Sequence, residues 1–138
     1  MDHLKNSECI FCKIVQGSIP CYHIYEDDTC LAFLDVAPLT TGHTLLIPKS
    51  HYVNLLDTPS FLIAHLNTIA KRIARHYLEA LGATGFKIHT NVGKNAGQVV
   101  NHYHIHIIPY YPKNSQLNEK PQLSNDAFQD LASKIKLN

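Results

Sequence analysis

The stretch "NHYHIHIIPYY" (residues 101–111) constrains the fold more than any other part of the chain, because histidines occupy every second position within it. Alternate side chains of a β-strand point to the same face, so His102, His104 and His106 would share one face. The side chains that would point the other way are Tyr103, Ile105 and Ile107. The alternation predicts a strand over residues 99–109, with an apolar face toward a core and imidazoles on the opposite face.

A second periodicity, over residues 59–81, predicts a long amphipathic helix. Apolar side chains recur there every three or four positions, Pro59 suits a first helical turn, and Gly82 suits the position after the helix. We expect Thr58 to cap this helix and its apolar stripe to pack on the core.

The remaining patterned segments complete an α+β fold. Apolar segments bounded by turn residues predict further strands at 21–28, 29–35, 43–48 and 85–92. Short helices are expected over 9–17 and from Asp126 onward. Strands that pair as hairpins beneath one long helix form an antiparallel sheet of about five strands. We therefore expect a single domain over residues 1–138, with a core over about 9–109 and a C-terminal tail over 110–138.

Composition narrows the class of protein. The 138 residues carry a formal net charge of +1, so no basic field indicates nucleic-acid binding. No apolar run approaches the ~20 residues of a membrane span, and the N-terminus lacks the features of a signal peptide. We expect a cytoplasmic protein with reduced cysteines, in which Cys9-x-x-Cys12 favours metal or redox chemistry. The alternative is that these two residues are merely buried thiols.

Three roles for the alternating histidines remain open on the residues alone. They could lie on a solvent-facing strand without further function. They could bind metal, although one ion shared by all three is disfavoured because the Cα atoms of His102 and His106 would lie ~13 Å apart on a strand. They could be catalytic, because imidazole is a nucleophile and proton carrier near neutrality. The neighbouring segment "NVGKNAGQ" favours the third role, since Gly93 and Gly97 let backbone amides approach an anion and Gln98 can donate to oxygen.

Three segments carry a resemblance to a known family. "GQVVNHYHIHIIP" resembles the histidine triad (HIT) signature, and "FLDVAPLTTGHTLLIPKSH" resembles the second signature of that family. "CIFCKIVQGSIPCYHIYEDD" is similar to the N-terminus of its Hint-type branch. The chain is identified as a member of the HIT family, close to Hint-type and bacterial HIT-like nucleotide hydrolases. The resemblance implies a HIT fold and a two-fold homodimer formed through the long helix and an adjacent strand.

The resemblance also implies a role for each matching residue. His104 would be the nucleophile, supported and oriented by His43 and His102. His106 would contact the phosphate or the leaving group, and Gln98 would stabilise charge in the transition state. Asp35 would accept hydrogen bonds from both ribose hydroxyls. The full substrate-binding set would be Ile10, Phe11, Phe33, Asp35, Leu45, Asn91, Gly97, Gln98, Val99, His104 and His106.

A zinc site follows from the same resemblance, because some bacterial-type relatives complete the Cys-x-x-Cys pair with two histidines. The implied Zn²⁺ ligands are Cys9, Cys12, His51 and His102. Two positions depart from the family pattern. Val99 stands where eukaryotic Hint-type members carry a serine, and Tyr110 stands where many bacterial relatives carry an arginine.

The predicted function is hydrolysis of purine nucleoside 5′-phosphoramidates or related adenylates at the α-phosphate, through a nucleotidyl-histidine intermediate. The expected partners are a purine nucleotide of the AMP or GMP type and a second copy of the chain. Alternatives are hydrolysis of dinucleoside polyphosphates, as in the Fhit-type branch, a nucleotide-binding regulatory module, and a zinc-storage or structural metal protein. The presence of His43, Gln98 and His104 together favours the enzyme.

Overall fold

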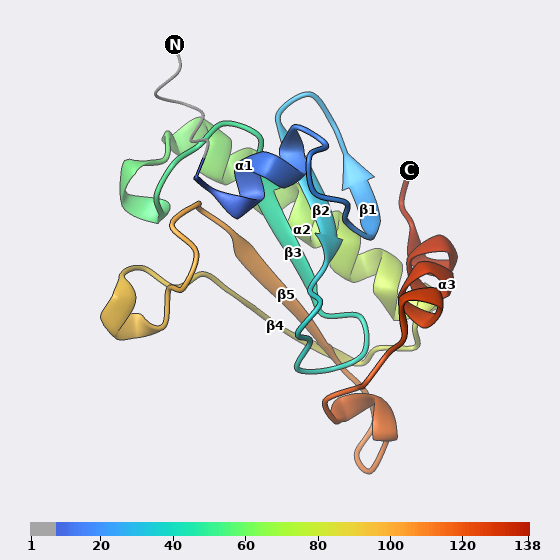
Figure 1. The fold of residues 1–138 in the computed structure, drawn as a ribbon. Coiled ribbons are helices and arrows are strands. Elements are labelled where there is room, and N and C mark those ends of the chain that lie inside the picture. The colour runs from blue at the N-terminus through green and yellow to red at the C-terminus, as the bar shows by residue number, and fades with distance from the viewer. Residues whose placement is uncertain (1–7) are drawn as a thin grey trace.

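Five antiparallel strands form one sheet in the order β1-β2-β3-β5-β4 (Figure 1). The computed structural model describes residues 8–138. The strands are β1 (His23–Glu26), β2 (Cys30–Leu34), β3 (Thr44–Pro48), β4 (Gly85–His89) and β5 (Ile105–Tyr110). The prediction of an α+β fold with a sheet of about five antiparallel strands is confirmed.

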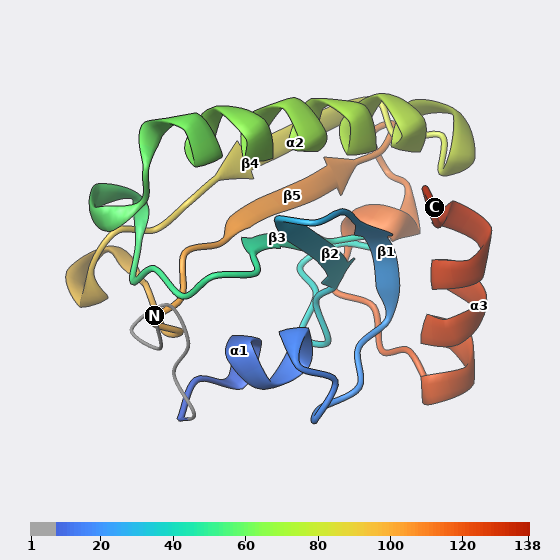
Figure 2. The ribbon, with the colours of Figure 1, turned by 90° about the horizontal axis from the view of Figure 1, so that it is seen from above.

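Helices cover both faces of this sheet (Figure 2). The long helix α2 (Ser60–Ala80) lies on one face and the short helix α1 (Ile10–Val15) on the other, while α3 (Asn125–Ile135) packs beside β1. Every residue of β2 and β3 is buried, as expected for strands with both faces covered. On β3, Leu46 belongs to the core beneath α2, whereas Leu45 and Ile47 belong to the core beneath α1. Among residues 8–138, no helix is long and apolar enough to cross a membrane.

The histidine-bearing strand is shorter than predicted. β5 begins at Ile105, so His102 and His104 precede it rather than lying within it. The reason is the backbone partner: the Tyr103 N–H donates to the carbonyl of Tyr52, 2.6 Å away, in a loop and not in a neighbouring strand. The imidazoles nevertheless lie on the α1 side of the sheet, because the Phe11 ring meets those of both His102 and His104.

The expected cap of the long helix is also wrong. Pro59 occupies the N-cap position of α2 without a side-chain cap. The Thr58 hydroxyl instead donates to the carbonyl of Asn54, 2.7 Å away, and closes the preceding 3-10 turn (Leu55–Asp57). Helix formation here rests on the apolar stripe, whose members Leu66, Ile73 and Tyr77 are fully buried.

The hydrophobic core continues past residue 110. Phe128, Ala132 and Ile135 of α3 belong to the same buried cluster as the inner face of α2, and the Tyr22 ring stacks on Phe128 at 4.8 Å. The boundary at residue 110 therefore marks where the sequence motifs stop, and the packing extends beyond it.

Candidate active site and metal-binding cluster

A cavity of about 400 Å³ opens between α1 and the face of the sheet opposite α2, called the outer face below. Its walls are mainly apolar, and one end carries imidazoles and a carboxylate. Among the predicted substrate-binding residues, those that line it are Ile10, Phe11, Phe33, Asp35, Leu45, Val99, His104 and His106. The size and the mixture of apolar walls with a few convergent polar groups are typical of a small-molecule site.

The surroundings of His104 determine its tautomer. Its Nδ1 lies 2.7 Å from the backbone carbonyl of His102, and a carbonyl can only accept, so Nδ1 carries the proton. The other ring nitrogen, Nε2, therefore keeps an in-plane lone pair. His104 is buried, and this burial lowers the pKa of the imidazole. The result is a neutral imidazole with one nitrogen available as a nucleophile.

A second hydrogen-bonded chain of groups links His43 to His106. The Leu39 N–H donates to Nδ1 of His43 at 3.0 Å, so the proton of the neutral His43 ring resides on Nε2. That Nε2 lies 3.0 Å from Nδ1 of His106 and 3.5 Å from a carboxylate oxygen of Asp35. His43 thus donates to His106, whose own proton is left on Nε2. Burial, reinforced by the charges of His104, His43 and His89, lowers the pKa of His106 to about 3.

His89 is a member of this group that the sequence-based predictions missed. It stands directly opposite His106 in the β4–β5 pairing, and the two rings stack at 4.8 Å with planes 14° apart. The alternation of "GFKIHTNV" marks a strand, but the pairing register that places residue 89 beside residue 106 is set by the loop between them. No local pattern of the sequence reports that register.

The loop residues Asn91, Gly97 and Gln98 do not line the cavity. The buried Gln98 amide holds the loop together: Nε2 donates to the carbonyls of Val53 and Val100, at 2.6 and 3.1 Å. Its Oε1 accepts from the N–H of Gly93 at 2.8 Å. The predicted role of Gln98 in the transition state remains a prediction, and it requires the amide to exchange these partners.

The four predicted metal ligands converge at the N-terminal end of α1. The Sγ and Nδ1 atoms of Cys9, Cys12, His51 and His102 all lie within 4.8 Å of one another. Cys12 Sγ is 3.3 Å from Nδ1 of His51 and 3.5 Å from Nδ1 of His102, and Cys9 Sγ is 3.4 Å from the latter. In a tetrahedral zinc site, sulfur and nitrogen ligands lie ~3.6 Å apart. The donor spacing therefore fits zinc.

The tautomer of His102 also fits a metal. Nε2 lies 2.8 Å from the carbonyl of Pro48 and must donate to it, which leaves the lone pair of Nδ1 directed at the cysteines. A carbonyl that orients a histidine ligand in this way is a common feature of metal sites. Burial lowers the pKa of His102 to about 4, so the ring is neutral at pH 7, as a ligand must be.

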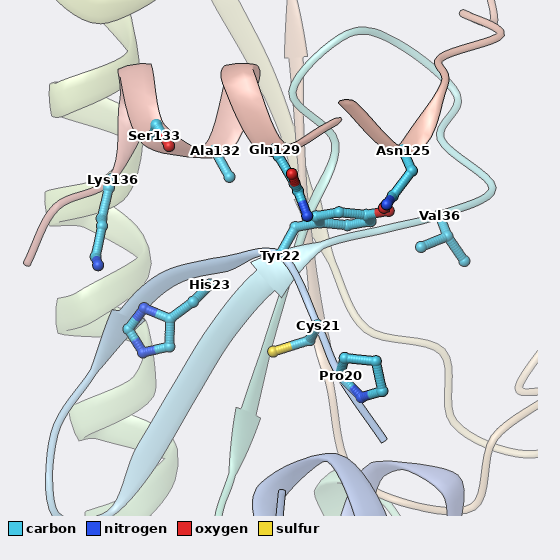
Figure 3. Close-up of a pocket in the computed structure, with 10 residues that line it drawn as sticks. All are labelled: Pro20, Cys21, Tyr22, His23, Val36, Asn125, Gln129, Ala132, Ser133 and Lys136. Carbon is cyan, nitrogen blue, oxygen red and sulfur yellow. The ribbon is translucent and has the colours of Figure 1, made fainter. Parts of the chain in front are cut away.

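Two other features of the described chain contain none of the imidazoles of the cavity and none of the four predicted metal ligands. Asp27, Cys30 and His65 form a hydrogen-bonded cluster, in which one oxygen of Asp27 already accepts from the backbone N–H groups of Thr29 and Cys30. A second hollow of about 580 Å³ lies between residues 20–23 and α3, where Tyr22 donates to Asn125 and Gln129 reaches over the same ring (Figure 3). It borders the cavity, because Pro20, Cys21 and Val36 line both.

Comparison with known proteins agrees with this geometry. The HIT domain matches residues 16–113. The adenylylsulfatase HINT3 of Arabidopsis thaliana is 46% identical over 103 residues, which are 75% of this chain and 52% of that protein. The chain thus spans about half the length of that plant relative.

Two solved structures share the fold over nearly the whole chain. A histidine triad nucleotide-binding protein from Sulfolobus tokodaii superposes with a TM-score of 0.85 at 32% identity, covering 92% of this chain and 89% of the other. A zinc-bound histidine triad family protein from Mycobacterium smegmatis superposes with a TM-score of 0.80 at 39% identity, covering 92% of each. With its signature motifs, its five-stranded sheet and its row of imidazoles beside a cavity, the chain belongs to the HIT domain family.

Proposed function

We propose that this protein hydrolyses purine nucleoside 5′-phosphoramidates or related adenylates at the α-phosphate. The observation that carries the proposal is the state of His104. The ring is buried, its Nδ1–H donates to a backbone carbonyl, and its Nε2 lone pair is available at the polar end of an apolar cavity. A neutral imidazole held in one tautomer is suited to attack on phosphorus.

The cavity has the layout that a nucleotide requires. Phe11, Phe33 and Leu45 form apolar walls that suit a purine base, while His104 and His106 lie where the α-phosphate would be placed. One oxygen of Asp35 accepts from the N–H of Ala37 at 2.9 Å, which fixes the carboxylate on the cavity wall. The rest of the carboxylate is then able to accept from the ribose hydroxyls.

The reaction takes place in two displacements. Nε2 of His104 forms a bond to phosphorus while the bond from phosphorus to the leaving group breaks, and the leaving group takes up a proton from the solvent, which the water of the second displacement returns. Water then attacks the nucleotidyl-imidazole, which releases the nucleoside monophosphate and restores the neutral ring. His106 supplies a donor, Nε2–H, beside the reacting phosphate, and His43 holds that tautomer through its bond to Nδ1. Asn91, Gly97 and Gln98 are proposed to stabilise the phosphate charge from the adjoining loop.

The adenylylsulfatase relative favours adenylates as substrates, since adenylylsulfate is an adenylyl group joined to sulfate. A hydrolysis panel tests the proposal: adenosine and guanosine 5′-phosphoramidates, adenylylsulfate and diadenosine polyphosphates. We expect turnover of the first two classes, its loss in His104→Ala, and retention of monophosphate binding in that variant, because a nucleophile stabilises the transition state more than the ground state. Preferential cleavage of diadenosine polyphosphates would support the Fhit-type alternative, and binding without turnover would support a regulatory module.

A structural zinc ion on Cys9, Cys12, His51 and His102 completes the proposal. Bound there, it would fasten α1, which contains Cys12 and Phe11 and has Cys9 as its N-cap, to the segment that precedes β5. Elemental analysis of protein purified without added metal should give about one zinc per chain. A content below about a tenth of an equivalent that supplementation does not restore would contradict it. Thiolate ligands require a reducing compartment, which agrees with a cytoplasmic location.

The proposed assembly is a homodimer formed through α2 and β4. A mainly apolar groove of about 350 Å³ runs between these elements, and Leu78 and Ile88 are 49% and 44% exposed beside it. Apolar side chains at that level of exposure, gathered along one groove, suit an interface with a second copy.

A further inference from the structure

Three imidazoles form a row across the outer face of the sheet. His43 lies just before β3, His106 lies on β5, and His89 lies opposite it on β4. The ring centroids of His43 and His106 are 5.2 Å apart, and those of His106 and His89 are 4.8 Å apart. The row runs from a buried end at His43 to an exposed end at His89. Only the first two members have a role in the mechanism above.

The contact between His89 and His106 is made through the ring faces. The planes are 14° apart, so the N–H groups of both rings point along the planes and not at each other. His89 therefore does not exchange a proton directly with His106. The His106 ring turns about its Cβ–Cγ bond, and the hydrogen bond from His43 at Nδ1 opposes that rotation. The His104 ring meets it edge-on at 5.0 Å, and His89 covers one of its faces.

The orientation of the His106 ring matters because Nε2–H must face the reacting phosphate. If the hydrogen bond at Nδ1 breaks, rotation about the Cβ–Cγ bond turns that donor away, and a second ring stacked on the face of the imidazole opposes this rotation. We propose, on the basis of the function proposed above, that His89 is a positioning residue of the catalytic site, which holds the His106 ring in its productive orientation by stacking on it.

The electrostatic surroundings agree with this placement. The groups around His89 are His106 opposite, His104 and His43 further along the site, Asp35 beside His43, and Lys87 two positions earlier on β4. A positive charge on His89 lowers the pKa values of His43 and His106. Loss of that charge should therefore raise both values, because like charges disfavour the protonated ring.

Two substitutions separate the parts of this effect. His89→Phe keeps a flat ring against His106 and removes the ionisable nitrogens, whereas His89→Ala removes both the ring and these nitrogens. Lys87→Ala is the matched control, since Lys87 is an exposed residue of the same strand and contacts Tyr110 outside the site. The readouts are kcat, KM and the pH profile for adenosine 5′-phosphoramidate, and the ¹⁵N shifts of the His106 ring in the nucleotide-free protein.

We expect His89→Ala to lower kcat about tenfold with KM little changed, which is less than the ~10²-fold loss that a 1 Å misplacement can cause. His89→Phe should recover most of kcat at neutral pH. In both variants the acid limb of the profile should move to higher pH, while Lys87→Ala should match the wild type. The ¹⁵N shifts should report a single His106 tautomer in the wild type and in His89→Phe, and a mixture in His89→Ala.

An unchanged kcat and a single His106 tautomer in His89→Ala would overturn the inference. Equal losses in His89→Ala and His89→Phe would also overturn it, since stacking would then have no effect. If the wild type hydrolyses no member of the panel, the proposed function fails, and the ¹⁵N shifts still decide whether His89 holds the ring.

Discussion

Replacement of Phe11 tests the link between the α1 contacts and the active site. The buried Phe11 ring meets three other rings edge-on: Phe33 at 5.6 Å, His102 at 5.9 Å and His104 at 5.2 Å. It is one of two buried side chains of a six-residue helix, the other being Cys12. A helix this short has little stability of its own, so its position depends on these contacts.

The expected cost follows from the packing. Phe11→Ala leaves a cavity against three rings and should lower the free energy of unfolding by about 3–5 kcal/mol. Phe11→Leu keeps most of the apolar volume and loses the edge-on aromatic contacts, so about 1–2 kcal/mol is expected. Phe61→Ala is the control, because Phe61 is 76% exposed and its removal should change stability by no more than about 0.5 kcal/mol.

Urea denaturation of protein with a defined zinc content measures these values, with m expected to stay constant. Phe11→Ala should also lower kcat/KM, since the ring packs on His104 and forms a wall of the nucleoside cavity. A loss of stability in Phe11→Ala no larger than that in Phe61→Ala would refute the reasoning, because α1 would then be held without this side chain.

Two further predictions concern pH and assembly. Burial and neighbouring imidazoles lower the pKa of His106 to about 3, so the neutral ring that accepts from His43 persists below the ordinary imidazole range. We therefore expect kcat/KM to fall only at pH values well under ~6.5. A half-loss above pH 6.5 in the pH–rate profile would contradict this. Ile88→Asp should give the mass of a monomer by light scattering, because it places a charge on the proposed interface, whereas Leu56→Asp at an 80% exposed position should not; a wild type that is itself monomeric at micromolar concentration would rule out the dimer.

The sequence predicted the elements whose pattern depends on their own side chains. The stripe of the long helix, with Leu66, Ile73 and Tyr77 inward, follows from helical periodicity alone. The buried strands β2 and β3 follow from short apolar runs between turn residues. The convergence of the four metal ligands followed from the family resemblance, and the structure brings their donor atoms together as expected.

What the sequence could not predict depends on hydrogen-bond partners and on register. The alternation through His102 and His104 predicts which way the side chains face. It does not predict that the Tyr103 N–H bonds to the loop carbonyl of Tyr52, so that the strand pairing begins only after this point. Gln98 lies in a glycine-rich segment of the kind that binds anions, but in the structure its side-chain amide donates to the backbone carbonyls of Val53 and Val100. The position of His89 beside His106 depends on the register between β4 and β5, which neither periodicity nor a sequence motif specifies.

His102 links the metal-binding cluster to the catalytic imidazoles, because its ring lies in the cluster and its backbone carbonyl bonds to His104. Its Nδ1 faces Cys9 and Cys12, while its carbonyl accepts from Nδ1–H of His104 and so keeps the nucleophilic nitrogen unprotonated. A ligand bond at the ring would restrain the same residue whose carbonyl sets the tautomer. Chelation should therefore loosen α1 first and reduce thermal stability, and it should reduce turnover only as the carbonyl of residue 102 becomes mobile. The two losses can be measured in one chelator titration, and a fall in turnover that precedes any fall in stability would show that the metal acts on catalysis by a route other than this carbonyl.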